Sequence, residues 1–259
     1  MINNDQQAWN KIPALTLLFW IMKITATTLG ETGGDLLAQT LNVGYATSTV
    51  IFFGFFLVML ALQLFSNKYV PLIYWAVIVA TSTAGTTMSD YMDRTLKLGY
   101  TVGSLILVSI LILILIIWRI TEKNLSVTEI NTRRGEIFYW IAILFSNTLG
   151  TALGDFLADD SGLGFAGSAL LISAVIGIVI LCYFFTRISR VVLFWIAFVL
   201  TRPFGATFGD LLTKPREHGG MDYGTKGASL ILGSILVILI IVETIKQRKP
   251  QSSHQLLSR

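Results

Sequence analysis

The feature of this sequence that most restricts its fold is a pattern that recurs four times along the chain. Each copy has a tryptophan, a glycine ten residues later, a small residue four positions further on with an aspartate directly after it, and a final glycine nine residues beyond the aspartate. The copies span residues 20–44, 75–99, 140–164 and 195–219. Copies one and three, and copies two and four, are each 120 residues apart, which indicates that a two-copy unit was itself duplicated.

The composition restricts the environment of the chain. Of its 259 residues, 54% are hydrophobic and 13% are charged, and the mean hydropathy is +0.70. Soluble domains carry about 25% charged residues, so we predict a membrane protein with a single integral domain, residues 1–259. A single cysteine, Cys182, and two histidines cannot build a disulfide framework or a thiolate metal site. We expect no cofactor and no nucleic-acid partner; the expected partner is the lipid bilayer, and the oligomeric state stays open.

Each copy contains two apolar segments. The leading segments begin near residues 14, 70, 137 and 191, and the trailing segments cover residues 45–65, 101–118, 165–184 and 228–244. Because about 20 apolar residues cross a bilayer as a helix, we predict an all-α integral membrane fold with eight transmembrane helices. These helices form four tandem two-helix repeats, residues 11–66, 67–120, 134–186 and 190–245, with a linker at 120–133 and a disordered tail at 247–259. Glycine and threonine interrupt the leading segments, so each leading helix is either tilted or broken at the motif.

The positive charges are distributed unevenly. Twelve Lys and Arg residues lie in the termini and between repeats, and five lie in the turns within repeats. The positive-inside rule therefore places both termini in the cytoplasm. Because every repeat crosses twice, the two halves should be related by an axis along the membrane normal, as in parallel-repeat transporters. The turn at residues 214–226 carries an insertion, which we interpret as a surface loop.

The motif combines a packing element with a charge. Two small residues one helical turn apart allow close helix packing in a membrane. Packing does not explain the aspartate that follows, because an ionisable residue at membrane depth costs about 2.5–3.5 kcal/mol and by default indicates function. We therefore predict an ion site built from the four motif aspartates as metal ligands, together with nearby oxygen-bearing side chains. The predicted site residues are Asp35, Asp90, Asp155, Asp210, Glu31, Asn147, Thr27 and Ser82.

The predicted site carries an excess of acids. Five acids stand against two bases within the spans, Lys23 and Arg202, which we expect to balance charge by pairing with acids. The surplus of three negative charges favours cations, and carboxylate, hydroxyl and carbonyl oxygens suit Mg²⁺, Ca²⁺ or Mn²⁺. Without a cation, some carboxylates should be protonated; Glu31 and Asp155 are the expected proton carriers, the latter because its span contains no base.

Two further groups have structural interpretations. The charged residues that follow the motifs predict a solvated rim or an external vestibule; they are Asp93, Arg94, Asp159, Asp160 and Lys214. The motif tryptophans predict an interfacial belt or packing anchors; they are Trp20, Trp75, Trp140 and Trp195.

The segments TLGETGGDLLAQ, TLGTALGDFLA and PFGATFGDLLT resemble those of bacterial multi-pass proteins described only as conserved membrane-anchored proteins, whose hairpins carry LGxxxGD. The resemblance covers most of the chain. It implies a protein of the bacterial cytoplasmic (inner) membrane and supplies no activity.

The leading hypothesis is a secondary transporter of a hard divalent cation, with proton-coupled export and alternating access between two four-helix halves. The alternatives are a cation channel, an organic-cation exporter and a non-transporting structural membrane protein. We do not expect an enzyme. Intramembrane aspartyl proteases carry GxGD, whereas the residues three before the aspartates here are Thr32, Thr87, Ala152 and Thr207.

Overall fold

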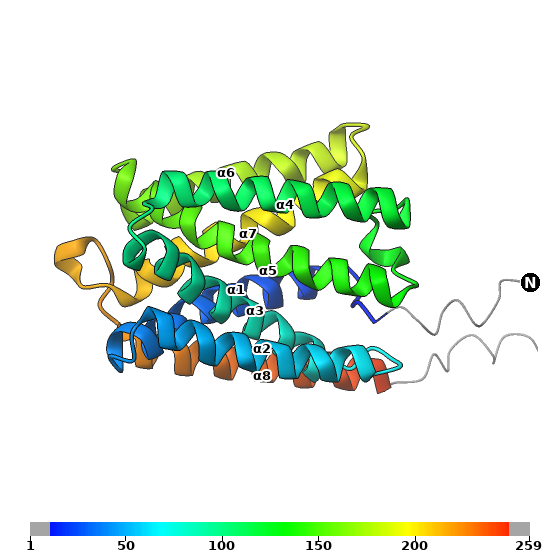
Figure 1. The fold of residues 1–259 in the computed structure, drawn as a ribbon, viewed down its shortest axis with the longest axis horizontal. Coiled ribbons are helices and arrows are strands. Elements are labelled where there is room, and N and C mark those ends of the chain that lie inside the picture. The colour runs from blue at the N-terminus through cyan, green and yellow to red at the C-terminus, as the bar shows by residue number, and fades with distance from the viewer. Residues whose placement is uncertain (1–10, 249–259) are drawn as a thin grey trace, which may run out of the picture.

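The computed structural model describes residues 11–248, and all of its regular structure there is helical (Figure 1). The eight long helices are α1 (Leu17–Asp35), α2 (Tyr45–Phe65), α3 (Pro71–Asp90), α4 (Tyr100–Glu122), α5 (Arg133–Asp155), α6 (Gly164–Phe185), α7 (Arg190–Thr213) and α8 (Gly224–Arg248). The predicted all-α fold with eight helices is thus confirmed. Residues 249–259 of the predicted tail lie outside the described residues, whereas residues 247 and 248 belong to α8.

The odd-numbered helices form a closed inner ring. Helix α1 packs against α3 and α7, and α5 packs against the same two helices from the opposite side of the ring. The even-numbered helices lie outside, and each packs mainly against the inner helix of the next repeat: α2 on α3, α4 on α5, α6 on α7 and α8 on α1. The repeats are therefore interlocked rather than four separate hairpins, and the last outer helix closes the ring on the first inner one.

The motif glycines explain how the inner helices approach one another. The first glycine of each motif lies against the residue eight positions before the aspartate of the next copy: Gly30 against Ser82, Gly85 against Asn147, Gly150 against Arg202, and Gly205 against Thr27. A Cβ atom added to Gly205 would lie 2.6 Å from Thr27 Oγ1. The small residues thus form the packing seam predicted for them, repeated at every junction of the ring.

The inner helices are not broken at the motif. Each remains α-helical through its aspartate, and in three repeats one π-helical turn follows at once: η1 (Leu36–Thr40), η2 (Tyr91–Thr95) and η4 (Phe156–Asp160). The threonines do not interrupt the helix because their hydroxyls donate to carbonyls one turn earlier, as Thr28 does to Ile24 at 2.9 Å. The expected break is replaced by a widened turn just after the aspartate, a feature that often occurs at functional sites.

The distribution of polarity is the reverse of that in a soluble protein. Lys23, Glu31 and Arg202 are buried within the inner ring, whereas large apolar side chains of the outer helices are exposed, for example Phe55 and Leu230. Six helices in the described part of the chain are long and apolar enough to cross a membrane: α2, α4, α5, α6, α7 and α8. The sequence predicts eight such helices, but α1 and α3 are not among these six. Their polar residues, which face the other inner helices, lower their mean hydropathy. This pattern is typical of a multi-pass membrane protein.

The motif tryptophans pack at one end of the inner ring. Trp75 and Trp140 are 0% and 1% exposed, so they are packing anchors and not members of a lipid-facing belt. The ring of Phe19 lies 5.7 Å from that of Trp75, and the ring of Tyr74 lies 5.4 Å from that of Trp140. The corresponding contact between α7 and α1 joins Phe194 to Trp20 at 5.9 Å. Aromatic side chains therefore close this end of the ring.

Candidate functional site

The four motif aspartates lie where the inner helices reach the opposite end of the ring. Asp35, Asp90 and Asp155 are the last residues of their helices, and Asp210 lies in the final turn of α7. Their exposed fractions are between 2% and 4%. The structure brings them together in two pairs, each held by one basic side chain.

The first pair joins Asp35 of α1 to Asp210 of α7. The ammonium of Lys214 lies 2.7 Å from Asp35 Oδ2 and 3.3 Å from Asp210 Oδ1. Gln39 donates a hydrogen bond of 2.6 Å to the other oxygen of Asp35. Burial alone lowers the pKa of Lys214, but Asp210 and Asp35 raise it more, so that its pKa lies above the ordinary value. Lys214 is therefore charged at neutral pH.

The second pair joins Asp90 of α3 to Asp155 of α5. Arg94 Nε lies 2.9 Å from Asp90 Oδ1, and Arg94 Nη2 lies 3.2 Å from Asp155 Oδ2. The guanidinium also lies over the ring of Tyr100, 5.7 Å from its centroid. The expectation that Asp155 lacks a base is wrong, because Arg94 reaches it from the neighbouring repeat.

The two bridging bases occupy the same position in the repeat. Arg94 and Lys214 both come four residues after the aspartate of their own copy, in copies two and four. Both lie in the segments for which the sequence predicts a solvated rim or an external vestibule. Arg94 is exposed there and Lys214 is half-buried, and each also neutralises a buried pair of acids. The signal for this role was the recurrence of a base at one position of the two-copy unit.

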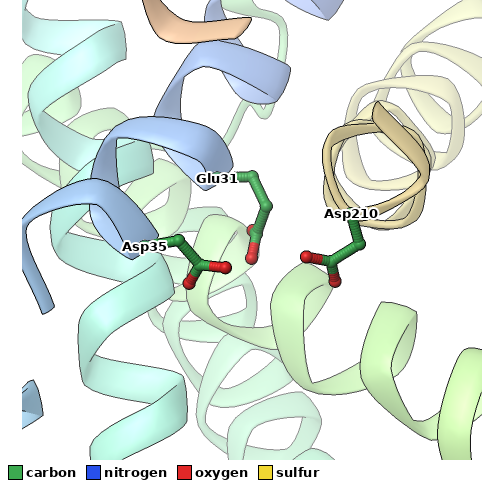
Figure 2. A group of neighbouring side chains, drawn as sticks. All are labelled: Glu31, Asp35 and Asp210. Atoms are coloured by element: carbon green, nitrogen blue, oxygen red, sulfur yellow. The ribbon is translucent and has the colours of Figure 1, made fainter. Parts of the chain in front are cut away.

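A third carboxylate lies beside the first pair. Glu31, Asp35 and Asp210 each offer an oxygen atom, and these oxygens all lie within 4.8 Å of one another. Figure 2 shows the three carboxylates turned toward a common point, two from α1 and one from α7. The equivalents of Glu31 in the other copies are Thr86, Thr151 and Ala206, so only one of the two pairs has this additional acid.

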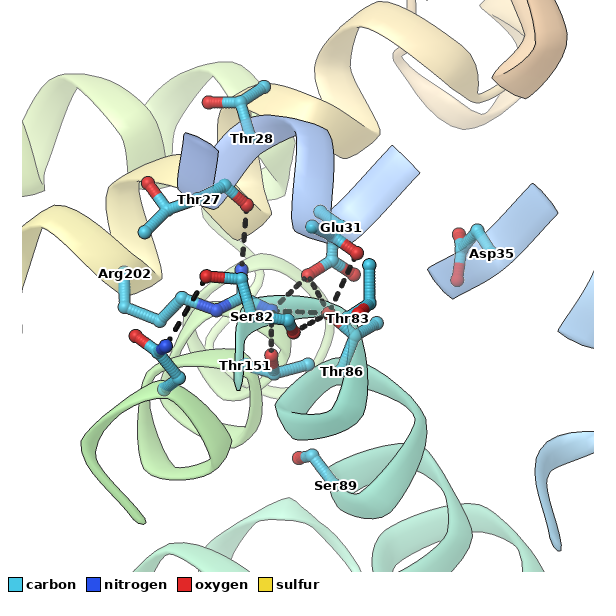
Figure 3. A network of polar contacts seen from close by, with 12 residues as sticks. Thr27, Thr28, Glu31, Asp35, Ser82, Thr83, Thr86, Ser89, Thr151 and Arg202 are labelled. Atoms are coloured by element: carbon cyan, nitrogen blue, oxygen red, sulfur yellow. Dashed lines mark hydrogen bonds and ion pairs between the residues drawn. The ribbon is translucent and has the colours of Figure 1, made fainter. Parts of the chain in front are cut away.

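Arg202 connects all four inner helices on the side of this cluster that faces the aromatic end of the ring (Figure 3). Its fully buried guanidinium lies 3.0 Å from Glu31 Oε2 and donates to Thr151 Oγ1 at 2.7 Å. It also donates to the hydroxyl of Thr86 and to the carbonyl oxygen of Thr27. Arg202 is therefore the ion-pair partner of Glu31.

Lys23 lies further from the aspartate end of the ring than Arg202 does, and it has different neighbours. Its ammonium is fully buried, 3.4 Å from Asn147 Oδ1 and 4.1 Å from the centroid of the Phe198 ring. Within residues 11–248 it forms no ion pair with a carboxylate, so the expected acid partner is missing. Asn147 in turn donates to the hydroxyls of Thr81 and Ser82. Thr27, Ser82 and Asn147 thus belong to the layer around Arg202 and Lys23, apart from the carboxylate cluster.

The charge balance of the site differs from the predicted one. Five acids, Glu31 and the four aspartates, form ion pairs with three bases, Arg94, Arg202 and Lys214. Lys23 is a fourth base in the ring, without such a pair among the described residues. The surplus of three negative charges falls to one. Net charge alone therefore does not select cations, and selectivity for them depends on how the carboxylates are arranged.

A cleft of about 300 Å³ opens onto the aspartate end. It is lined by Arg94, Asp159, Phe165, Asp210, Lys214 and His218. The insertion in the fourth copy supplies His218 and folds back on α7, where the Met221 amide donates to the Leu211 carbonyl at 2.7 Å. The cleft reaches Asp210 and Lys214, whereas the opposite end of the ring is closed by the aromatic layer.

Comparison with known families agrees with the internal repeat. The family described as Repeat of Unknown Function (DUF347) matches residues 18–69, 73–124, 138–189 and 193–249. The chain belongs to this family. Each match covers one inner helix and the outer helix that follows it, as the four-copy pattern predicts. No curated protein and no solved structure matches the chain. The comparisons thus support a repeat family and supply no activity.

Proposed function

We propose that this protein is a multi-pass membrane transporter whose substrate is a hard divalent cation, such as Mn²⁺, Mg²⁺ or Ca²⁺. The observation that carries the proposal is the convergence of three buried carboxylates, Glu31, Asp35 and Asp210, within 4.8 Å of one another. Two oxygens bound to the same Ca²⁺ at about 2.3–2.6 Å are at most about 5 Å apart. An ion at the centre of the cluster therefore fits all three acids with only small movements.

The membrane setting rests on the exposed apolar surface and on the charged loops. A chain whose polar groups are enclosed and whose outer helices expose leucine and phenylalanine is stable in lipid and not in water. We place both termini and the aromatic end on the cytoplasmic side of the bacterial inner membrane, following the Lys and Arg distribution. The cleft and the aspartates then face outward.

Proton coupling is part of the proposal because carboxylates must be ionised to bind a metal ion. A cation that leaves the cluster toward the cleft is replaced by protons or by a protein base. For transport, the aromatic end must open while the cleft closes. Rocking of two rigid four-helix halves would separate α4 from α5 and α8 from α1, so we propose smaller movements of the interlocked helices.

A cation channel is the second candidate. It is favoured by one observation, the closed ring of inner helices that surrounds the acids. Against it, the acids form two unlike pairs and not a uniform ring, and Arg202 occupies the middle of the ring. Single-channel currents in a planar bilayer would favour the channel, whereas saturable flux with proton movement would favour the carrier.

The experiment is cation flux in reconstituted vesicles that contain a dye responsive to Mn²⁺, Mg²⁺ or Ca²⁺, or a pH dye. We expect Mn²⁺ entry and opposite proton movement with the wild type. Asp35→Asn and Asp210→Asn should reduce the flux about 100-fold, because each removes a charged ligand. Glu217→Gln is the matched control, since the side chain of Glu217 is 79% exposed on the insertion. A wild type that moves none of the three cations would overturn the proposal.

A further inference from the structure

The two bases that bridge the aspartate pairs are chemically different. Lys214 is the residue directly after α7, at the start of the insertion, and its side chain is 21% exposed. Arg94 lies within the π turn η2 and is fixed by two aspartates and by the ring of Tyr100. A guanidinium is a rigid planar fork, whereas an ammonium is a compact charge on a flexible stem. Lys214 therefore has the more flexible side chain, although its exposed fraction of 21% is smaller than the 35% of Arg94.

The ammonium of Lys214 lies on two of the three carboxylates that a bound cation would use. It contacts Asp35 Oδ2 and Asp210 Oδ1, and both residues belong to the cluster of three converging carboxylates. The buried Oδ1 atoms of Asp210 and Asp90 both accept no hydrogen bond from the described residues. Lys214 nevertheless lies 3.3 Å from the first, and Arg94 lies 2.9 Å from the second. A divalent ion and the ammonium therefore compete for the same two carboxylates.

The surroundings of Lys214 leave room for its displacement. The side chain borders the cleft of about 300 Å³ that reaches Asp210. It also borders a second hollow of about 420 Å³, formed in part by Gln39, Pro215 and Tyr223. Because Lys214 borders both hollows, its side chain can leave the acids by moving into either of them.

We infer that Lys214 is a tethered counter-cation, which occupies the Glu31, Asp35 and Asp210 site in the absence of substrate and is displaced by the incoming divalent cation. This inference rests on the proposed function. It assigns unlike roles to the two bases: Arg94 holds Asp90 and Asp155 together permanently, while Lys214 competes with the substrate. Such a competitor weakens binding and speeds release, as a transporter requires.

The test places either a positively charged or a neutral side chain at position 214 after the protein has folded. In a Cys182→Ser background, Lys214→Cys is treated with 2-aminoethyl or 2-hydroxyethyl methanethiosulfonate, which leave side chains of similar length that are charged or neutral. Mn²⁺ binding to the purified protein in detergent is followed by the electron paramagnetic resonance signal of the free ion. We expect the neutral adduct to bind Mn²⁺ about tenfold more tightly than the ammonium adduct, because one competing charge-assisted contact is removed.

Lys226→Cys treated in the same way is the matched control, because Lys226 is exposed in the same insertion. The Mn²⁺ affinities of its two adducts should differ by less than about twofold. Equal affinities of the two adducts at position 214, with Mn²⁺ still bound, would overturn the inference and leave the proposed cation site standing. Absence of Mn²⁺ binding in the wild type and in both adducts would overturn the cation site and the inference together.

Discussion

The two aspartate pairs come from the same repeated motif, are similarly buried, and are each bridged by one base. They differ in the residues beside them. Asp35 and Asp210 have a third carboxylate, Glu31, one helical turn away, whereas the equivalent positions beside Asp90 and Asp155 carry threonine. The difference teaches that duplication supplied one scaffold twice and that substitution at one position made only one pair able to surround a metal ion.

The same asymmetry is present in the next layer of the ring, between the acids and the aromatic end. Arg202 of copy four pairs with Glu31 of copy one, and these copies are neighbours because α7 and α1 close the ring. The copies that flank the other pair carry Ser82 and Asn147 at the position of Arg202. Charged residues are thus concentrated at the α7–α1 junction, and neutral hydroxyls and amides at the α3–α5 junction.

The largest expected effect concerns the buried ion pair at the charged junction. Arg202→Met leaves Glu31 without its partner, and breaking a buried pair in this way costs about 3–5 kcal/mol. We expect a large fall in the thermal midpoint in detergent. The double variant Glu31→Gln with Arg202→Met should recover most of that loss, since no unpaired charge remains. A double variant as unstable as the single one would show that Arg202 stabilises the ring through its other contacts.

The second prediction compares the two pairs directly. Asp35→Asn and Asp210→Asn should weaken Mn²⁺ binding about 100-fold, because a charged ligand is lost. Asp90→Asn and Asp155→Asn should weaken it less than about tenfold, through the more distant field alone. Titration of the purified variants with Mn²⁺ measures both. Equal losses in all four variants would mean that the pairs form one site.

The fold and the site were predictable to different degrees. The four copies were sufficient for eight helices, but the leading helices, expected to be tilted or broken at the motif, continue unbroken through the aspartate. The copies did not predict the interlocked packing, because outer helices such as α6 are apolar on all sides and their partners cannot be read from a polar face. The base partners of the acids were not predicted either, because the sequence does not show which copies lie side by side. Arg94 reaches Asp155, and Lys214 reaches Asp35, only because the ring brings the next copy alongside.

The third prediction tests the mobile base against the fixed one. Lys214→Gln should tighten Mn²⁺ binding about tenfold and slow its release, since the competitor is gone. Arg94→Gln should tighten binding much less, through the more distant field alone, because the pair it neutralises is not the cluster of three acids. Stopped-flow release of Mn²⁺ into a chelator gives the off-rate of each variant. Faster release from Lys214→Gln than from the wild type would contradict the competition.

The smallest expected effect concerns the anchor of the fixed pair. The carboxylate of Asp93 in η2 packs against Gly103 of α4 and accepts a hydrogen bond from Ser89 at 3.2 Å. Burial raises the pKa of Asp93 to about 6, although Ser89 and Arg94 act to lower it. An unfolded aspartate titrates near 3.9, so the folded protein binds a proton that the unfolded chain has already released between about pH 4 and about pH 6.

Stability from this group is therefore present at low pH and is lost as the pH rises through about 6. We expect the thermal midpoint of the wild type to fall between pH 5 and pH 7 by about 3 °C more than that of Asp93→Asn, which keeps the shape without the titrating group. Asp159→Asn, in the π turn of copy three, is the control and should retain the wild-type slope, since Asp159 is exposed. Identical slopes in the wild type and Asp93→Asn would show that η2 is not held by a protonated carboxyl. In that case Arg94 alone would account for the rigidity of the second pair.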